Sequence, residues 1–214
     1  VRPFAAASDD GILPHIVRIH FSQAGLVDQL LTELYELDQI VYAEKIPLAR
    51  TTATPNDYAL TSASLHLNQI NATGAWNYFS GNSNITVAIV DNAVMWTHAD
   101  LVGNVYTNAG ETPNNGIDDD NNGYIDDVNG FDVADWDNDP LPPSVNMSHG
   151  TMCAGIGAAR TDNNNGVASI GWNVKMIPVK AQPDQGSVST VLYGYEGIVY
   201  AARAKAKIIS CSWG

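Results

Sequence analysis

The chain has 214 residues, of which 45% are hydrophobic, and a formal net charge of -13 from 23 acidic and 10 basic side chains. The chain is long enough for one sizeable core, and no apolar run in it is long enough to cross a bilayer. The excess of acidic side chains disfavours nucleic acid and anionic membranes as partners. The two cysteines, Cys153 and Cys211, lie among small or apolar neighbours and are interpreted as buried thiols rather than as a disulfide.

Residues 1–50 predict a small α+β segment. The stretch "HIVRIHF", at 15–21, alternates apolar and polar residues and predicts a strand. Residues 24–40 place leucines at helical spacing, and "VYAEKIP", at 41–47, again predicts a strand. A strand–helix–strand unit is too small to bury a core alone. Residues 51–64, rich in Thr, Ser, Ala and Pro, predict a linker.

Residues 65–214 predict strands that alternate with helices. A short helix is expected at 71–79, strands at 84–94, 174–181 and 207–214, helices at 149–160 and 189–206, and a long loop at 103–147. This alternation predicts an α/β fold, a mostly parallel sheet with helices on both faces. Functional sites in such sheets form at the carboxyl ends of the strands.

Two residues at such positions form a candidate acid–base pair. Asp91 ends an apolar strand, and His149 opens a helix of small residues, "SHGTMCAGIGAA". An aspartate that accepts a hydrogen bond from one ring nitrogen leaves the other nitrogen as a base. Each residue alone also fits a structural role, as a strand-end cap or a structural histidine.

An acidic loop between residues 118 and 139 contains no basic residue. Within "DDDNNGYIDD", oxygen side chains alternate and Gly123 stands sixth, a pattern that wraps Ca²⁺. The candidate ligands are Asp118, Asp120, Asn122, the backbone carbonyl of Tyr124, and Asp127. Asn129 replaces the Glu of an EF-hand loop, so no helix–loop–helix pair is expected. An Asn/Asp-rich turn is the alternative, but mutual repulsion of the carboxylates favours calcium. Magnesium is disfavoured because it retains more water.

Four motifs resemble those of the subtilisin-like serine proteases, the subtilases. "VAIVDNAVMWTHADL" resembles their aspartate motif, "SHGTMCAGIGAA" their histidine motif, "IISCSWG" their substrate-binding strand, and "TPNDYALTSASLHLNQINATGAW" the segment before the first strand. They occur in the family's order across residues 54–214. The resemblance implies a subtilisin-like fold, incomplete in this chain, and a triad in which Asp91 and His149 serve a serine. Asn92-Ala93 and Met152 depart from the family's Thr-Gly and second His.

The resemblance also implies how protein or peptide substrates bind. Ser212, Trp213 and Gly214 would form one wall of the cleft, and "QGSVS", with Gly186 and Ser187, the opposing edge. Trp213 also fits an ordinary core role. In the family the nucleophilic serine follows the strand that ends here at Gly214. The chain is therefore interpreted as the N-terminal portion of an endopeptidase, inactive alone, whose partner is the serine-bearing portion.

Three further expectations follow from the resemblance. A second calcium site would use Asp57, Asp100 and Asn163, although a plain helix cap and turn is the alternative. Residues 1–50 would be part of a propeptide, with the maturation junction within 48–55. The protein would be secreted. The rival functions are a catalytically inert calcium- or peptide-binding module and a calcium-dependent adhesion module.

Overall fold

A computed structural model describes residues 15–20, 22, 24–45, 54–60 and 64–214. The chain divides into two compact units, Val1–Leu48 and Ala49–Gly214. No helix in the described ranges has the length and hydrophobicity that a membrane crossing requires. The expected maturation junction, at 48–55, and parts of the expected linker fall largely outside the described residues.

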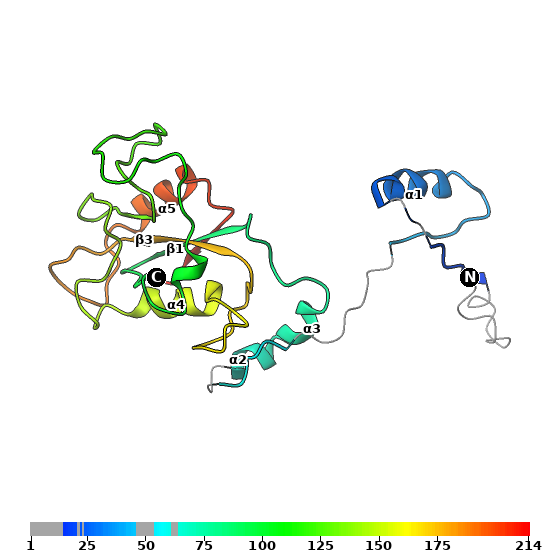
Figure 1. The fold of residues 1–214 in the computed structure, drawn as a ribbon, viewed down its shortest axis with the longest axis horizontal. Coiled ribbons are helices and arrows are strands. Elements are labelled where there is room, and N and C mark those ends of the chain that lie inside the picture. The colour runs from blue at the N-terminus through cyan, green and yellow to red at the C-terminus, as the bar shows by residue number, and fades with distance from the viewer. Residues whose placement is uncertain (1–14, 21, 23, 46–53, 61–63) are drawn as a thin grey trace. The chain divides into compact units, whose positions relative to one another are not determined.

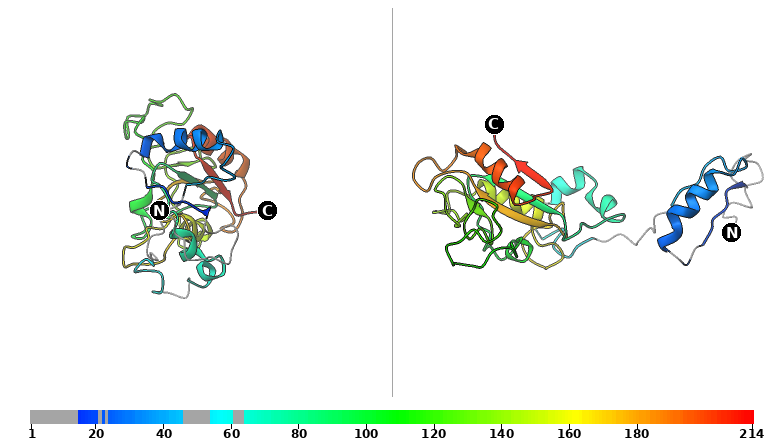
Figure 2. Two further views of the ribbon diagram at one scale, coloured as in Figure 1. Left: turned by 90° about the vertical axis from the view of Figure 1, so that its right-hand side faces the viewer. Right: turned by 90° about the horizontal axis from the view of Figure 1, so that it is seen from above.

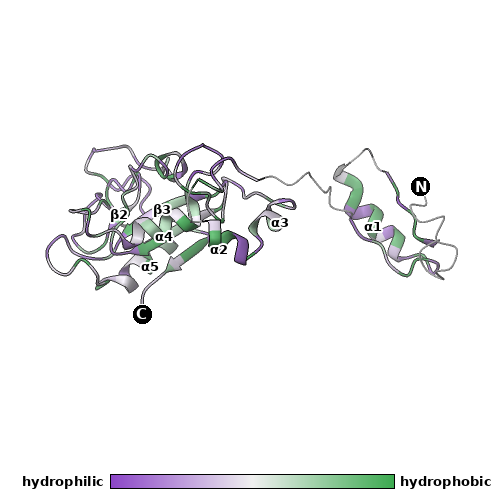
Figure 3. Cartoon of the chain, turned by 90° about the horizontal axis from the view of Figure 1, so that it is seen from below, coloured by the Kyte–Doolittle hydropathy of each residue, from purple (hydrophilic) through white to green (hydrophobic). Residues whose placement is uncertain are grey.

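The described residues of the first unit contain the short 3-10 turn η2 (Ala24–Leu26) and the helix α1 (Val27–Tyr35). Hydrophobic and hydrophilic positions alternate along α1 (Figure 3), yet none of its residues is buried. The strands predicted at 15–21 and 41–47 are wrong where they can be compared, because residues 15–20 and 41–45 form no strand. The alternation of apolar and polar residues did not by itself produce a β-strand, because the described part of this segment has no buried core against which a strand could pack.

The second unit is built on a four-stranded parallel sheet (Figure 1). Its strands are β1 (Thr86–Asp91), β2 (Phe131–Asp132), β3 (Lys175–Lys180) and β4 (Ile208–Cys211), in the spatial order β2-β3-β1-β4. β4, the red arrow of Figure 2, is an edge strand. Asp91 is paired with Lys180, and Val90 with Cys211. The carboxyl ends of β1, β3 and β4 therefore meet at one edge of the sheet.

Helices α4 (His149–Ala158) and α5 (Gly194–Arg203) cover opposite faces of the sheet (Figure 1). Ala88, Val90, Ile177 and Val179 pack with Tyr200 and Ala201 of α5, whereas Ile89 and Met176 pack with Ala154 and Ala158 of α4. Neighbouring strand residues face opposite layers, so β1 and β3 are apolar on both sides. The predicted α/β sheet with helices on both faces is confirmed.

Other elements differ in detail from the sequence-based prediction. Helices α2 (Ser64–Gln69) and α3 (Ala72–Trp76) precede β1, and the 3-10 turn η3 (Val102–Asn104) and β2 lie in the predicted long loop. β2 was not expected, because its two residues are too few to show a period. The expectation of two buried cysteines is wrong for Cys211, which is exposed, while Cys153 is half-buried.

Candidate active site and cation sites

Asp91 and His149 meet at the carboxyl edge of the sheet. His149 Nδ1 lies 2.8 Å from Asp91 Oδ1, which also accepts a hydrogen bond from the Asn92 amide at 2.7 Å. Asp91 is 1% exposed, whereas the His149 side chain is 52% exposed. Because the carboxylate is acceptor-only, Nδ1 carries the proton and Nε2 is left as the base. The structure thus brings the sequence-predicted pair together in the geometry of a general-base dyad.

Gly150 allows the histidine helix to approach the end of β1 this closely. A Cβ at this position would lie 2.4 Å from the Ala93 carbonyl oxygen and 2.7 Å from Asp91 Cβ. Either separation is well below a van der Waals contact, so any larger residue would push α4 away from β1. The small residues that follow, Ala154 and Ala158, keep the helix against the sheet.

Asn92, which sequence reasoning treated only as a departure from the family motif, connects three elements of the site. Its Nδ2 donates to the Val188 carbonyl at 2.9 Å, and its Oδ1 accepts from the amides of Ala93 at 2.8 Å and Gly150 at 3.0 Å. The residue is 3% exposed. One amide therefore joins the end of β1, the start of α4 and the segment that carries Ser187.

Replacing Asn92 with Ala is expected to destabilise the full-length protein by about 2–4 kcal/mol. The change leaves the buried N–H groups of Ala93 and Gly150 without partners, and each such loss costs about 1–3 kcal/mol. Urea unfolding measures the effect. Asn82→Ala is the matched control, because Asn82 is exposed and, among the described hydrogen bonds, its side chain only accepts from the nearby Asn84 amide. Equal destabilisation by both substitutions would contradict the bridging role.

Cys153 lies one turn after His149 on α4, with its Sγ 3.8 Å from His149 Nδ1. Burial raises the pKa of the Cys153 thiol, and a hydrogen bond with Ser212 partly opposes this. The charge of Asp91 and a hydrogen bond between the thiol and Asp91 raise the pKa further. The sulfur is therefore a neutral thiol at neutral pH. Since His149 Nδ1 is already held by Asp91, the geometry disfavours a cysteine nucleophile.

The expected substrate walls lie at the same edge of the sheet. Ser212, Trp213 and Gly214 follow β4 directly. The Trp213 indole donates to the Val90 carbonyl at 2.8 Å and packs so tightly that a Cβ on Gly194 would lie 2.5 Å from its ring. Trp213 is thus fixed beside the residue that precedes Asp91.

The segment expected to form the opposing side of the substrate cleft, which includes Gly186 and Ser187, is held by two hydrogen bonds. The Val188 carbonyl accepts from Asn92, and the Thr190 hydroxyl donates to Gln182 at 3.0 Å. Gly186 has a φ of +125°, which favours glycine. Among the described hydrogen bonds, none joins Gly186 or Ser187 to residues 212–214.

In the acidic loop, three carboxylates converge. Oxygens of Glu111, Asp120 and Asp127 lie within 4.8 Å of one another, and Glu111 and Asp127 are buried. Sequence reasoning missed Glu111, because it lies outside the spaced motif. Its two oxygens accept from the amides of Asp120 and Asp126, which draws it into the loop. Burial raises the pKa of Asp127 above the usual range, against hydrogen bonds from Asn108, Tyr200 and Asn122 that lower it.

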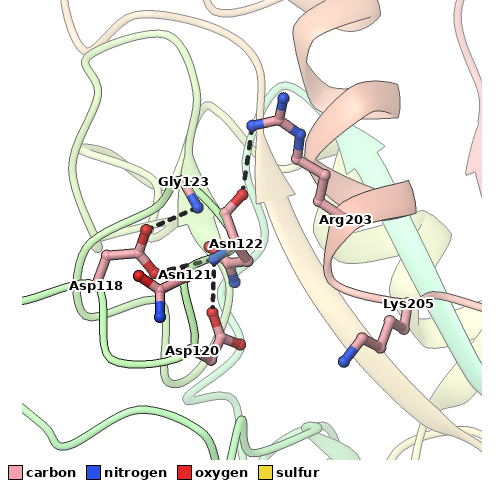
Figure 4. A pocket seen from close by; sticks show the side chains of 7 residues that line it. All are labelled: Asp118, Asp120, Asn121, Asn122, Gly123, Arg203 and Lys205. Carbon is pink, nitrogen blue, oxygen red and sulfur yellow. Dashed lines mark hydrogen bonds between the residues drawn. The ribbon is translucent and has the colours of Figure 1, made fainter.

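Figure 4 shows three of the predicted ligands, Asp118, Asp120 and Asn122, on the same loop beside a pocket. Asp118 accepts from the amides of Asn122 and Gly123, at 3.0 and 2.8 Å, and so shapes the loop. Asn122 Nδ2 donates to Asp127 at 3.1 Å, and Asn122 Oδ1 accepts from the Tyr124 amide. A pocket opens here between the loop and the end of α5, where Arg203 donates to the Asn122 carbonyl at 3.3 Å.

A second acidic cluster already contains its own cation. Lys180, with a side chain 2% exposed, contacts Asp132 and Asp184 at 2.5 Å and Asp135 at 3.5 Å. Burial would lower the pKa of the Lys180 ammonium, but its hydrogen bonds to Asp132 and Asp184 outweigh burial and raise it. In contrast, none of the ion pairs among the described residues neutralises Glu111, Asp120 or Asp127. The oxygen-only donor set of that cluster suits a hard divalent cation.

The residues of the expected second calcium site also come together. Asp100 accepts from Asn163 Nδ2 and from the Val167 amide, both at 2.8 Å, and Asp57 Oδ2 accepts from the Asn163 amide at 3.3 Å. Asp57 is 1% exposed, and its Oδ1 has no hydrogen-bond partner among the described residues. Gly166 makes room, since a Cβ there would lie 2.0 Å from Asp100 Oδ2. An orphaned buried carboxylate oxygen beside a second carboxylate fits a cation.

The sequence is similar to several known proteins, one of which is named an extracellular serine protease. It is 30% identical to halolysin of Haloferax mediterranei over 87% of this chain and 32% of that protein. It is 31% identical to the halolysin-like extracellular serine protease Nep of Natrialba magadii, over 83% of this chain and 29% of that protein. It is 35% identical to thermitase of Thermoactinomyces vulgaris, over 75% of this chain and 48% of that protein. The chain thus spans less than half the length of each of these relatives.

This chain is also similar in structure to a solved complex, the Aeromonas sobria serine protease with its chaperone. The TM-score is 0.48 and the sequence identity is 23%, and the match covers 67% of this chain and 20% of the chain in that structure. The model of the subtilase family matches residues 82–214, which include Asp91, His149 and all four strands. The chain belongs to the subtilase family.

Proposed function

We propose that this chain is the N-terminal portion of a secreted, calcium-binding serine endopeptidase. The observation that carries the proposal is the hydrogen bond between His149 and the buried Asp91, within a chain of the subtilase family. Peptide-bond hydrolysis requires a general base close to a nucleophile. The His149 side chain is 52% exposed, and its Nε2, which is not the nitrogen that contacts Asp91, is available for that role. Secretion is supported by a relative whose name describes it as extracellular.

In the proposed mechanism His149 Nε2 takes the hydroxyl proton of a serine that lies outside residues 1–214. That serine attacks the peptide carbonyl, and His149 returns the proton to the leaving amine. Asp91 holds the ring in the required tautomer and stabilises the imidazolium form. Residues 212–214 and 186–187 would hold the substrate backbone on either side, as an added strand.

Calcium is proposed at two places. In the acidic loop, Asp120, Asp127 and Glu111 would bind it, with Asn122, Asp118 and the Tyr124 carbonyl completing or shaping the shell. In the second site, Asp57, Asp100 and Asn163 would bind it, with the Asn163 amide turned to present its oxygen. When bound, the ions would offset carboxylate repulsion and link the segment before β1 to the loop after α4.

Residues 1–50 are proposed to be part of a propeptide, joined to the catalytic portion through residues 51–64. The absence of buried residues in α1 supports this, because a segment without its own core needs a partner surface to stay folded. The cut that separates the two portions is proposed within residues 48–55.

A fluorophosphonate probe, which reacts with activated serines, tests the proposal in the full-length protein. We expect labelling of one serine outside residues 1–214, identified by peptide mass spectrometry, together with hydrolysis of casein. The control is protein denatured before exposure to the probe, which should not be labelled. Labelling of a serine within residues 1–214, or no labelling and no hydrolysis, would contradict the proposed function and favour an inert binding module.

A further inference from the structure

Asp91, His149 and Cys153 also form a group of three different metal-ligating side chains. One ligand atom of each, a carboxylate oxygen, a ring nitrogen and the thiol sulfur, lies within 4.8 Å of the other two. His149 and Cys153 are four residues apart on α4, so they share one face of the helix. The dyad uses the nitrogen and one oxygen but gives the sulfur no role.

A second observation points to an additional ligand at this place. Asp91 is 1% exposed, yet its Oδ2 has no hydrogen-bond partner among the described residues. A buried carboxylate oxygen without a donor is costly unless a positive group is near it. The His149 side chain beside it is 52% exposed, which leaves a path from solvent.

The chemistry of the donors selects the ion. Sulfur and nitrogen donors suit zinc, whereas calcium takes oxygen ligands. With Zn–S of about 2.3 Å and Zn–N of about 2.0 Å, two tetrahedral ligands lie roughly 3.5 Å apart. The 3.8 Å between Cys153 Sγ and His149 Nδ1 is close to that value, and the 2.8 Å between Nδ1 and Asp91 Oδ1 would have to widen.

We propose that Asp91, His149 and Cys153 form a zinc site that inhibits the enzyme. Zinc would bind His149 at Nδ1, and the neutral imidazole would keep its one proton on Nε2, the nitrogen that must otherwise act as the base. The thiol proton of Cys153 would be released to solvent, and water would fill the fourth position. The imidazole would then be held by the metal instead of by Asp91. Its proton affinity and orientation would no longer suit a general base. Only the inhibition rests on the proposed function, since metal binding is independent of it.

Cobalt absorption tests the site without relying on activity. Co²⁺ is added to the full-length protein under reducing conditions, with calcium in excess to occupy the oxygen-only sites. We expect a thiolate-to-cobalt charge-transfer band that zinc abolishes. The band should disappear in Cys153→Ser and Cys153→Ala and persist in Cys211→Ser, the matched control. Absence of the charge-transfer band in the wild type, or persistence of the band in both Cys153 variants, would contradict the proposed metal site.

Zinc inhibition of peptide hydrolysis, measured relative to each variant's own activity, is the second readout. Loss of a direct ligand should raise the inhibitory zinc concentration by about 100-fold or more in Cys153→Ala, because loss of an outer-shell partner already costs 10- to 100-fold. Cys211→Ser should match the wild type. Equal zinc sensitivity in all three proteins would overturn the inhibitory role. A cobalt band in a protein without hydrolysis would instead overturn the proposed protease function and leave the site intact.

Discussion

Replacing His149 with Ala in the full-length protein is expected to abolish peptide hydrolysis, with kcat falling by about 10⁴- to 10⁶-fold. The substitution removes the only ring that Asp91 orients, so no base remains to accept the serine proton. Self-maturation at the expected junction, 48–55, should stop for the same reason. Turnover of a fluorogenic peptide measures the first effect, and intact mass spectrometry of the expressed protein measures the second.

Two further variants separate chemistry from folding. Asp91→Asn retains the shape of the site but favours the wrong tautomer, and should lower kcat by roughly 10⁴-fold. His98→Gln changes an exposed histidine whose side chain, among the described hydrogen bonds, only accepts from the Asp100 amide. It should change kcat by less than about threefold. Unchanged turnover in the His149 variant, with its fold verified by circular dichroism, would remove the assigned role from this residue.

Removal of calcium is expected to destabilise the full-length protein by about 4 kcal/mol for each site at 1,000 times its Kd. The physical reason is that Glu111, Asp127 and Asp57 are buried without a basic partner among the described ion pairs. Without a cation their charges repel or remain desolvated. Calorimetric unfolding with and without a chelator measures the loss, and calcium, but not magnesium, should restore the transition.

Single substitutions assign the two sites. Asp57→Asn and Asp127→Asn should each weaken one calcium-binding event by isothermal titration and lower the unfolding temperature in calcium, but not in chelator. Asp139→Asn is the matched control, because Asp139 is exposed and, among the described hydrogen bonds, its side chain only accepts from the Leu141 amide. If chelation leaves the unfolding temperature unchanged, or if Asp139→Asn weakens binding as much as the others, the calcium assignment is wrong.

The sequence predicted the parts of the fold that depend on local pattern. The apolar runs that became β1 and β3 are buried on both faces, and the small residues of "SHGTMCAGIGAA" allow α4 to pack closely. The position of Asp91 at a strand end and of His149 at a helix start predicted their meeting. Local pattern failed at residues 15–20 and 41–45, the described parts of the two predicted strands, where alternation without a described core gave no strand.

The sequence by itself determined the family, the parallel sheet and the Asp91–His149 pair, because motif spacing and hydrophobic period are local properties. Only the tertiary structure decided that Glu111 joins Asp120 and Asp127, that Lys180 neutralises Asp132, and that Asn92 bridges β1 and α4. These contacts join residues far apart in the chain, and they depend on strand register and loop path. The same charge pattern therefore gave one acidic cluster its own ammonium and left the other without a basic partner among the described ion pairs.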